Sequence, residues 1–327
     1  MGEPGGVGPD ISLAAWLRRA EGRTPPFFWL GDPQFLAARA RRLGVSVPLA
    51  PAEPEDAAAL FAHALPVRPV GDGLADRPGE ARPESAGLVI GAIEQAASLV
   101  RQGRAAAVVT NPIHKAALYG AGFGFPGHTE YLAALAANGG PPPKPVMMLA
   151  ADELKVVPVT IHVPLRDVPA LLTPDLIVET GLIVAADLRR RFGLAAPRLV
   201  VAGLNPHAGE AGTIGREDED IVRPAVDILR REGVDATGPL PADTMFHAAA
   251  RARYDAALCM YHDQALIPIK TLAFDRGVNV TLGLPFVRTS PDHGTALDLA
   301  GTGRADPSSL VEALRLAARI ARCGDDR

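Results

Sequence analysis

The stretch that decides the fold, residues 259–306, reads CMYHDQALIPIKTLAFDRGVNVTLGLPFVRTSPDHGTALDLAGTGRAD. The apolar run 256–261 leads into it and predicts a buried strand that ends at His262. One helix length later comes Lys270, and residues 278–282 predict a second strand, which contains Asn279. Polar groups at strand ends of an open α/β sheet are where ligands bind. This part of the chain therefore predicts a functional site on an α/β fold.

A second polar cluster follows in the same stretch. Residues 288–295, RTSPDHGT, bring charge, hydroxyl groups and turn formers into eight positions. Taken one at a time, each of these residues is equally well explained as a cap, a turn former or a surface residue. Together they favour a functional site.

Length and composition limit the possible functions. The 327 residues predict two domains, and 48% hydrophobic residues suffice for sizeable cores. A net charge of −4 and only 5% aromatic residues argue against nucleic-acid binding. No apolar run approaches about 18 residues, so we expect no membrane span. Two cysteines make no disulfide framework, which favours the cytoplasm.

The remaining elements alternate between strands and helices. A loop rich in glycine and proline, residues 2–10, feeds a helix that we expect to begin near Ile11. Residues 48–83 read as irregular surface. Strands are expected at 27–30, 105–110, 146–149, 156–161 and 198–204, and helices at 84–103, 174–192 and 217–232.

Three of the eight histidines directly follow predicted strands: His162, His207 and His262. Parallel strands end at one edge of a sheet, so these imidazoles are able to converge. Three histidine ligands around an open position suit a catalytic divalent metal. The alternative is three unrelated histidines that bind backbone groups, and the residues alone leave both open.

Another pair precedes a predicted helix, in FPGHTEYL at residues 125–132. His128 or Thr129 could cap that helix. A histidine beside a hydroxyl at a helix start is also a good receptor for a phosphate or carboxylate.

The chain resembles the 4-hydroxythreonine-4-phosphate dehydrogenase family, NAD(P)-dependent enzymes of pyridoxal phosphate synthesis. The resemblance runs from residue 2 to about 320. It is carried by GEPGGVGPD, TNPIHKAALYGAGFGFPGHTEYLA, GLNPHAGEAGTIGREDEDIVRPAV, GPLPADTMFH and the stretch quoted above. The GHTE and YHDQ motifs are its most specific parts. At its start it differs, because Met1 stands where the family usually has a strand, and we expect an empty sheet position if that strand is missing.

The resemblance implies two α/β/α domains with mixed, largely parallel sheets and an active cleft between them, as in isocitrate and isopropylmalate dehydrogenases. We expect residues 1–130 plus 300–327 to form the first domain. Residues 131–299 would form the second, with most metal and substrate residues and the dimer interface.

The resemblance also implies residue roles. The metal ligands would be His162, His207 and His262, shared across a homodimer interface and holding Zn, Mg, Co or Mn. Substrate contacts would come from His128, Thr129, Lys270, Asn279 and Arg288. Asp243 and Lys270 would be catalytic, and His293, Gly294 and Thr295 would contact NAD or NADP.

The implied reaction is oxidation of 4-phosphooxy-L-threonine at C3, followed by metal-assisted decarboxylation to 3-amino-2-oxopropyl phosphate. A related dehydrogenase acting on phosphorylated threonate or erythronate, or on a cis-dihydrodiol carboxylate, is the alternative. A second is a non-catalytic protein that binds phosphorylated metabolites.

Overall fold

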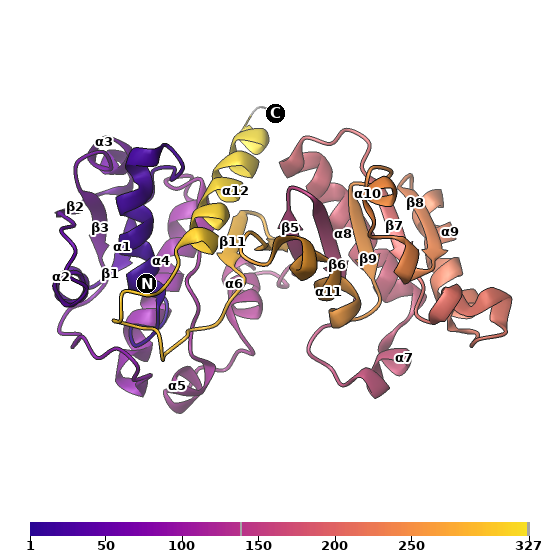
Figure 1. Cartoon of the computed structure of the whole chain (residues 1–327), viewed down its shortest axis with the longest axis horizontal. Coiled ribbons are helices and arrows are strands. Elements are labelled where there is room, and N and C mark those ends of the chain that lie inside the picture. The colour runs from indigo at the N-terminus through magenta and orange to yellow at the C-terminus, as the bar shows by residue number, and fades with distance from the viewer. Residues whose placement is uncertain (138, 326–327) are drawn as a thin grey trace. The chain divides into compact units, whose positions relative to one another are not determined.

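The computed structural model describes residues 1–137 and 139–325 and divides into two compact units (Figure 1). Unit 1 comprises Met1–Pro145 and Leu284–Ala321, and unit 2 comprises Val146–Gly283 with the end of the last helix from Arg322. Both units alternate helices with largely parallel strands, which confirms the predicted α/β class. Residues 131–145 and 284–299, assigned above to the second domain, lie in unit 1.

Unit 1 has two groups of strands. Strands β1 (Trp29–Gly31), β3 (Leu65–Pro69) and β2 (Leu49–Pro51) form a parallel sheet in that order, and β4 (Ala107–Val109) pairs in parallel with β11 (Val287–Pro291). The helices are α1 (Gly8–Leu17), α2 (Pro33–Arg42), α3 (Ala57–Leu60), α4 (Ala86–Arg101), α5 (Lys115–Gly120), α6 (His128–Ala136) and α12 (Ser308–Asp325).

The expectation of irregular surface at residues 48–83 is wrong. This segment contains β2 and β3, and β3 is the central strand of its sheet. Leu65 and Val67 are fully buried on it, against Trp29 and Phe35. The sequence did not predict this strand because LPVRP contains two prolines, and proline normally argues against a central strand.

Unit 2 has one sheet, with its strands in the order β10 (Val278–Leu282), β5 (Val146–Ala151), β6 (Leu154–Pro158), β9 (Ala256–Cys259), β7 (Arg198–Ala202) and β8 (Asp235–Leu240). Strand β5 is antiparallel to both neighbours, and the other pairs are parallel. The carboxyl ends of β6, β9, β7 and β8 therefore lie at one edge. This edge positions the candidate site.

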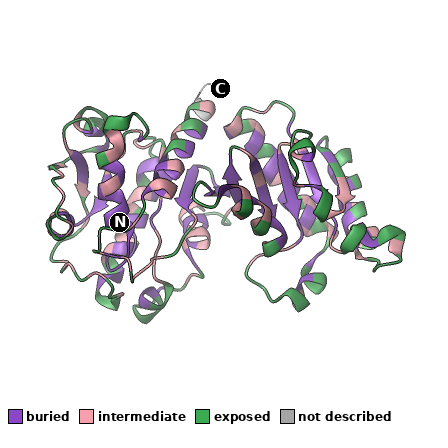
Figure 2. Cartoon of the chain, in the orientation of Figure 1, coloured by how far each residue is buried: buried purple, intermediate pink, exposed green. Residues whose placement is uncertain are grey.

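Helices cover both faces of this sheet. Helix α11 (His262–Ala273) packs Ala265 and Ile269 against alternate strand residues such as Val156 and Ala257. Helices α8 (Pro174–Phe192) and α9 (Arg223–Arg231) cover the other face, while the short helices α7 (Val168–Leu171) and α10 (Ala248–Arg251) lie in connections. The strands are buried and the outer helix faces exposed (Figure 2).

One predicted helix is divided. Residues 217–232 were expected to form a single helix, but a π-helical turn occupies Asp218–Val222 and α9 begins only at Arg223. Pro224 stands in the first turn of α9, where its missing N–H is tolerated. Helix 174–192 is found as predicted, between the cap residue Thr173 and Gly193.

No single described helix has the length and apolar character needed to cross a membrane. The bent pair Leu165–Leu171 and Pro174–Phe192, at 91° to each other, meets those criteria only when joined.

Candidate active site

Two of the three strand-end histidines lie together in unit 2. His162 follows β6 and His262 opens α11 after β9, and these two strands are neighbours. The centroids of the two rings are 5.6 Å apart, with an angle of 42° between the ring planes. The third, His207, follows β7, the next strand in the sheet, and is exposed.

Buried polar contacts hold these strand ends in place. The Thr160 hydroxyl donates to the Met260 carbonyl over 2.8 Å, which ties the His162 loop to the His262 loop. The side chain of Gln264 continues the chain of contacts: its Oε1 accepts from the Met260 N–H and its Nε2 donates to the Gly203 carbonyl, both over 2.7 Å. Gly203 follows β7, so one buried glutamine joins the loops of His262 and His207.

The loop that carries His207 has an unusual backbone. Every residue from His207 to Gly212 has a positive φ, between 43° and 88°. Left-handed turns are unfavourable for residues other than glycine, so single cases are the rule. The buried carboxylate of Asp218 stabilises this loop by accepting from the N–H groups of Leu204, at 2.7 Å, and Asn205, at 3.0 Å. His162 also has a positive φ, 51°. Such backbone outliers cluster at functional sites.

The imidazole pair has chemistry that suits a metal. His262 Nδ1 lies 2.8 Å from the Asp263 carboxylate, an arrangement that fixes the ring and leaves Nε2 available as a ligand. Within residues 1–137 and 139–325 of one chain, however, no group of three or more His, Cys, Asp and Glu side chains is arranged to hold a metal. The two histidines of one chain therefore fit part of a metal site.

The other candidate site residues of unit 2 lie at different distances from the strand ends that carry the histidines. Asp243 is exposed in the turn after β8, which packs beside the turn of His207. Lys270 leaves α11 eight residues after His262, about 12 Å along the helix axis. Asn279 lies on β10 opposite Leu149 of β5. Asp243 thus accompanies the histidine edge, while Lys270 and Asn279 are set back from it.

Unit 1 carries a second group, built around a buried cation. Arg288 on β11 is 4% exposed and donates through Nη2 to the Thr110 hydroxyl over 2.7 Å. Burial lowers the pKa of Arg288 to about 10, so it stays charged at neutral pH. Burial, and then the charge of Arg288, hold the pKa of His128 well below its usual value. His128 is accordingly a neutral imidazole beside a fixed positive charge.

The start of α6 is open to an anion. The cap position is Gly127, which has no side chain, so neither His128 nor Thr129 is the capping residue, and the first turn already carries one carboxylate, that of Glu130. The free N–H groups and the helix dipole favour a negative group there. Lys115, which the sequence did not single out for this role, lies close by: a Cβ on Gly127 would be 3.7 Å from its Nζ.

The proposed cofactor residues occupy the loop after β11. His293 and Gly294 are exposed, and His293 Nδ1 lies 2.9 Å from the Gly294 carbonyl. The Thr295 carbonyl accepts from the N–H of Val7 over 2.9 Å, so this loop packs on the glycine-rich loop 2–10. A Cβ on Gly6 would lie 2.8 Å from that carbonyl, which explains the need for glycine.

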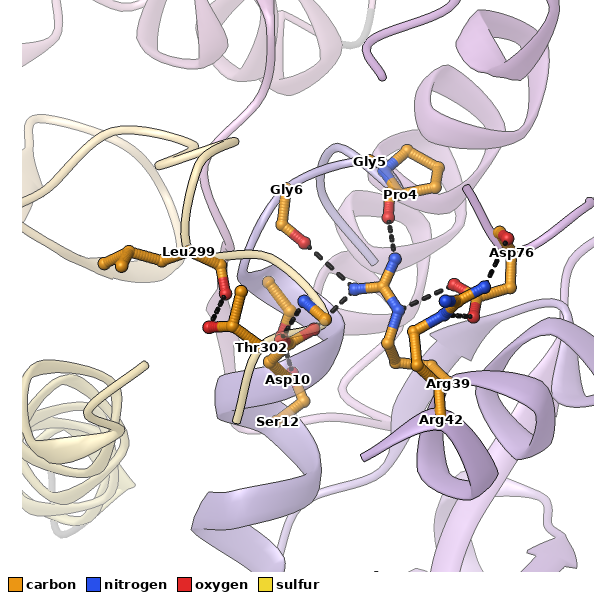
Figure 3. A network of polar contacts seen from close by, with 12 residues as sticks. Pro4, Gly5, Gly6, Asp10, Ser12, Arg39, Arg42, Asp76, Leu299 and Thr302 are labelled. Carbon is orange, nitrogen blue, oxygen red and sulfur yellow. Dashed lines mark hydrogen bonds and ion pairs between the residues drawn. The ribbon is translucent and has the colours of Figure 1, made fainter. Parts of the chain in front are cut away.

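A fully buried arginine fixes these two loops (Figure 3). Arg39 donates to the carbonyl groups of Pro4 and Gly6 and forms ion pairs with Asp10 and Asp76. Asp10 in turn accepts from the N–H of Gly301 over 2.6 Å. This role of Arg39 was not predictable from the sequence, because Arg39 stands in the run ARARR, which reads as solvated surface.

The chain is similar to known proteins over nearly all its length. A family model described as pyridoxal phosphate biosynthetic protein PdxA matches residues 23–317. A 4-hydroxythreonine-4-phosphate dehydrogenase of Xanthobacter autotrophicus is 64% identical over 98% of this chain and 92% of that protein. One from Zymomonas mobilis is 48% identical over 98% of this chain and 94% of that protein.

Comparison with solved structures agrees with the comparison of sequences. A 4-hydroxythreonine-4-phosphate dehydrogenase from Klebsiella pneumoniae has a TM-score of 0.85 at 37% identity, with 98% of each chain covered. A terephthalate 1,2-cis-dihydrodiol dehydrogenase from Burkholderia xenovorans has a TM-score of 0.65 at 28% identity, with 97% of this chain and 96% of that chain covered.

Proposed function

The chain belongs to the pyridoxal phosphate biosynthetic protein PdxA family, and from that premise we propose that it oxidises 4-phosphooxy-L-threonine at C3 with NAD or NADP and then decarboxylates the product. The final product is 3-amino-2-oxopropyl phosphate, for pyridoxal phosphate synthesis. The observation that carries this proposal is the pair of His162 and His262 at neighbouring strand ends, 5.6 Å apart.

The substrate phosphate binds in unit 1. Arg288 supplies a buried positive charge and a guanidinium that is able to bind a phosphate through bidentate hydrogen bonds. His128, Thr129 and the first N–H groups of α6 supply further hydrogen-bond donors. Lys115 adds a second, more exposed charge. A neutral His128 is able to donate one hydrogen bond without adding to the positive charge around Arg288.

A divalent metal, Zn, Mg, Co or Mn, would be held by His162, His207 and His262. When bound, it lowers the pKa of the substrate alcohol and polarises the ketone that forms. Imidazole ligands favour Zn and Co over Mg within this set. Asp263 orients the His262 ring, and Gln264 fixes the spacing between the loops of His262 and His207.

The chain's own side chains move the protons. Asp243, exposed beside the His207 turn, would take the proton of the C3 alcohol, and a bound nicotinamide would supply the hydride acceptor. Lys270 returns a proton once carbon dioxide has left, and Asn279 contacts the substrate. His293, Gly294 and Thr295 border the nicotinamide cofactor, on the loop that Arg39 and Asp10 hold rigid.

A homodimer completes the site. Three exposed apolar side chains lie on the segments that carry His162 and His262: Leu165, just after His162, is 67% exposed, and Ile267 on α11 and Phe274 at its end are 64% and 73% exposed. Lys270 lies between the last two on the same helix, so a subunit seated on this surface would meet it. Such apolar exposure is typical of an interface. We place the dimer in the cytoplasm, in line with its two free cysteines.

The interface is tested with Phe274→Asp, which should give monomers in sedimentation and lose turnover together with metal affinity. The exposed Tyr119→Asp in unit 1 serves as the control and should stay dimeric. Monomers that retain full turnover would refute the shared site.

The activity is tested by incubating the protein with 4-phosphooxy-L-threonine, NAD or NADP and added Zn²⁺, Mg²⁺, Co²⁺ or Mn²⁺, and following reduced nicotinamide by absorbance. We expect turnover that stops in chelator and returns with metal. Binding of cofactor and phosphate without any turnover would instead indicate a non-catalytic binding protein.

A second candidate function is favoured by the similarity to the terephthalate 1,2-cis-dihydrodiol dehydrogenase. A cis-dihydrodiol carboxylate, or a phosphorylated threonate or erythronate, would then replace the amino acid. A cis-dihydrodiol carboxylate carries no phosphate, and the buried charge of Arg288 with the open start of α6 gives a phosphate its natural site. The same assay with these diols decides the matter.

A further inference from the structure

The motif GHTE, residues 127–130, contains one residue to which the proposed function gives no role, Glu130. Glu130 is the third residue of α6 and carries the negative charge of its first turn. A carboxylate is an unexpected neighbour for a phosphate receptor, because like charges repel each other. Its exact position therefore bears on how the receptor selects its ligand.

The carboxylate of Glu130 turns back over the start of its own helix. A Cβ placed on Gly127, the cap residue, would lie 3.5 Å from Glu130 Oε2. The same Cβ would lie 3.5 Å from Cε and 3.7 Å from Nζ of Lys115, the first residue of α5. One carboxylate and one ammonium group thus border the space above the cap residue, where an anion would meet the first turn of α6.

Glu130 also acts on the buried cation of this site. Burial lowers the pKa of Arg288 to about 10, and the negative charge of Glu130 partly offsets that effect. Burying a positive charge costs free energy unless an opposite charge or hydrogen bonds compensate it. The carboxylate of Glu130 therefore offsets part of the cost of burying Arg288.

The contacts of Glu130 allow it to leave this position. In a capping box, the acidic side chain at the third helical position reaches back to the cap residue, while the side chain of the cap residue reaches forward. Gly127 has no side chain, so only the acidic half of that arrangement is present. Glu130 is also partly exposed, so its carboxylate is able to rotate into solvent without becoming a buried charge.

We propose that Glu130 is an internal competitor for the phosphate receptor: its carboxylate lies at the start of α6 until a phosphate monoester displaces it into solvent. This inference rests on the proposed function, which puts the substrate phosphate beside Arg288 and the first turn of α6. The competition sets a threshold, because an anion binds only where its own contacts exceed those of Glu130. Inorganic phosphate lacks the contacts that the rest of the substrate makes, so it binds weakly.

The first test is Glu130→Gln, which keeps the size of the side chain and removes its charge. Titration calorimetry of the full chain should show inorganic phosphate binding about 10-fold more tightly to this variant. In the activity assay, KM for 4-phosphooxy-L-threonine should fall in the same proportion while kcat does not rise. Glu21→Gln is the matched control, because it removes one exposed carboxylate from the same unit and should change neither quantity.

A second variant, Gly127→Ala, tests the position of the anion. Its methyl group would fill the space between Glu130 and Lys115 at ordinary contact distances, so the chain should fold with little change in melting temperature. Inorganic phosphate should bind at least about 10-fold more weakly to it, because the methyl group covers the first N–H groups of α6.

Three results would overturn the inference. Equal or weaker phosphate binding by Glu130→Gln, at an unchanged melting temperature, would mean that the carboxylate supports the receptor. Equal tightening in Glu21→Gln would indicate a general effect of net charge. Unchanged affinity in Gly127→Ala would put the anion elsewhere.

Failure of the proposed reaction is a separate result. If Glu130→Gln binds phosphate more tightly than the original chain, and neither turns over 4-phosphooxy-L-threonine, the inference about Glu130 stands and the proposed activity is wrong.

Discussion

The two candidate centres differ most in their access to water. The phosphate receptor that we propose in unit 1 centres on Arg288, which is almost fully buried, and on His128, whose pKa burial holds well below its usual value. The imidazole centre of unit 2 stands open, with His162 and His207 exposed amid apolar surface. The electrostatic attraction between a receptor and a charged ligand is stronger where water is excluded. If a second subunit completes the imidazole centre, as we propose, that centre has to be open in the single chain. Substitutions in the two units should therefore affect different kinetic constants.

The largest effect is expected at the imidazole centre. His262→Ala or His162→Ala should lower kcat by more than ~1000-fold, beyond the 10–100-fold typical of residues that only support a ligand. Melting temperature should hardly change, because His162 is exposed and His262 is only partly buried. The exposed His247→Ala in the same unit is the control and should retain activity. Near-normal turnover of His262→Ala in chelator would refute the metal role.

The next effect concerns the buried cation. Arg288→Met should raise KM for the phosphorylated substrate about 10- to 100-fold, because a hydrogen bond to a charged group contributes roughly 1.5–3 kcal/mol. Arg191→Met is the matched control: burial also lowers the pKa of Arg191 to about 10, but it lies in α8 of unit 2 beside Asp187. Arg191→Met should lose stability without raising KM. Similar KM changes in both variants would indicate general unfolding.

A smaller effect is expected where Gln264 joins two loops of unit 2. Gln264→Leu leaves the Met260 N–H and the Gly203 carbonyl without partners, at about 1–3 kcal/mol each in the free energy of unfolding. It should also lower kcat about 10-fold while KM stays the same. Gln264→Glu retains the acceptor for Met260 and should recover part of the stability. The exposed Gln102→Leu in unit 1 should change neither quantity, as denaturant unfolding and assays will show.

The smallest effect is a pH dependence in unit 1. Since burial lowers the pKa of His128 in the folded chain, the unfolded chain binds its proton first as the pH falls below about 6.5. Stability from this group is complete above that pH and is lost below it. Denaturant unfolding at pH 7.5 and 5 should show a smaller acid loss for His128→Gln than for the original chain. The exposed His63→Gln should leave the loss unchanged.

The sequence predicted much of this arrangement because its signals are local. Runs such as ALCMYH place a histidine directly after a buried strand. Parallel pairing of the strands then brings these histidines to the same edge of the sheet. The supporting residues escaped notice because their roles depend on distant partners. Gln264 bonds a carbonyl 61 residues away, and Arg39 bonds a loop about 33 residues away. A glutamine two positions after His262, on the buried side of its helix, was the available signal. Strand β3 escaped because two of its five residues are proline.

The six-residue turn at His207–Gly212 has a consequence for chirality. Four of its residues, His207, Ala208, Glu210 and Ala211, adopt the mirror-image helical conformation without being glycine. At ~1–2 kcal/mol per residue, the turn costs roughly 4–8 kcal/mol. In a semisynthetic chain, D-alanine at positions 208 and 211 would remove the cost at two of these four residues, roughly 2–4 kcal/mol. The stability gained by such a chain would measure what the two natural L-alanines lose by adopting the turn that carries His207.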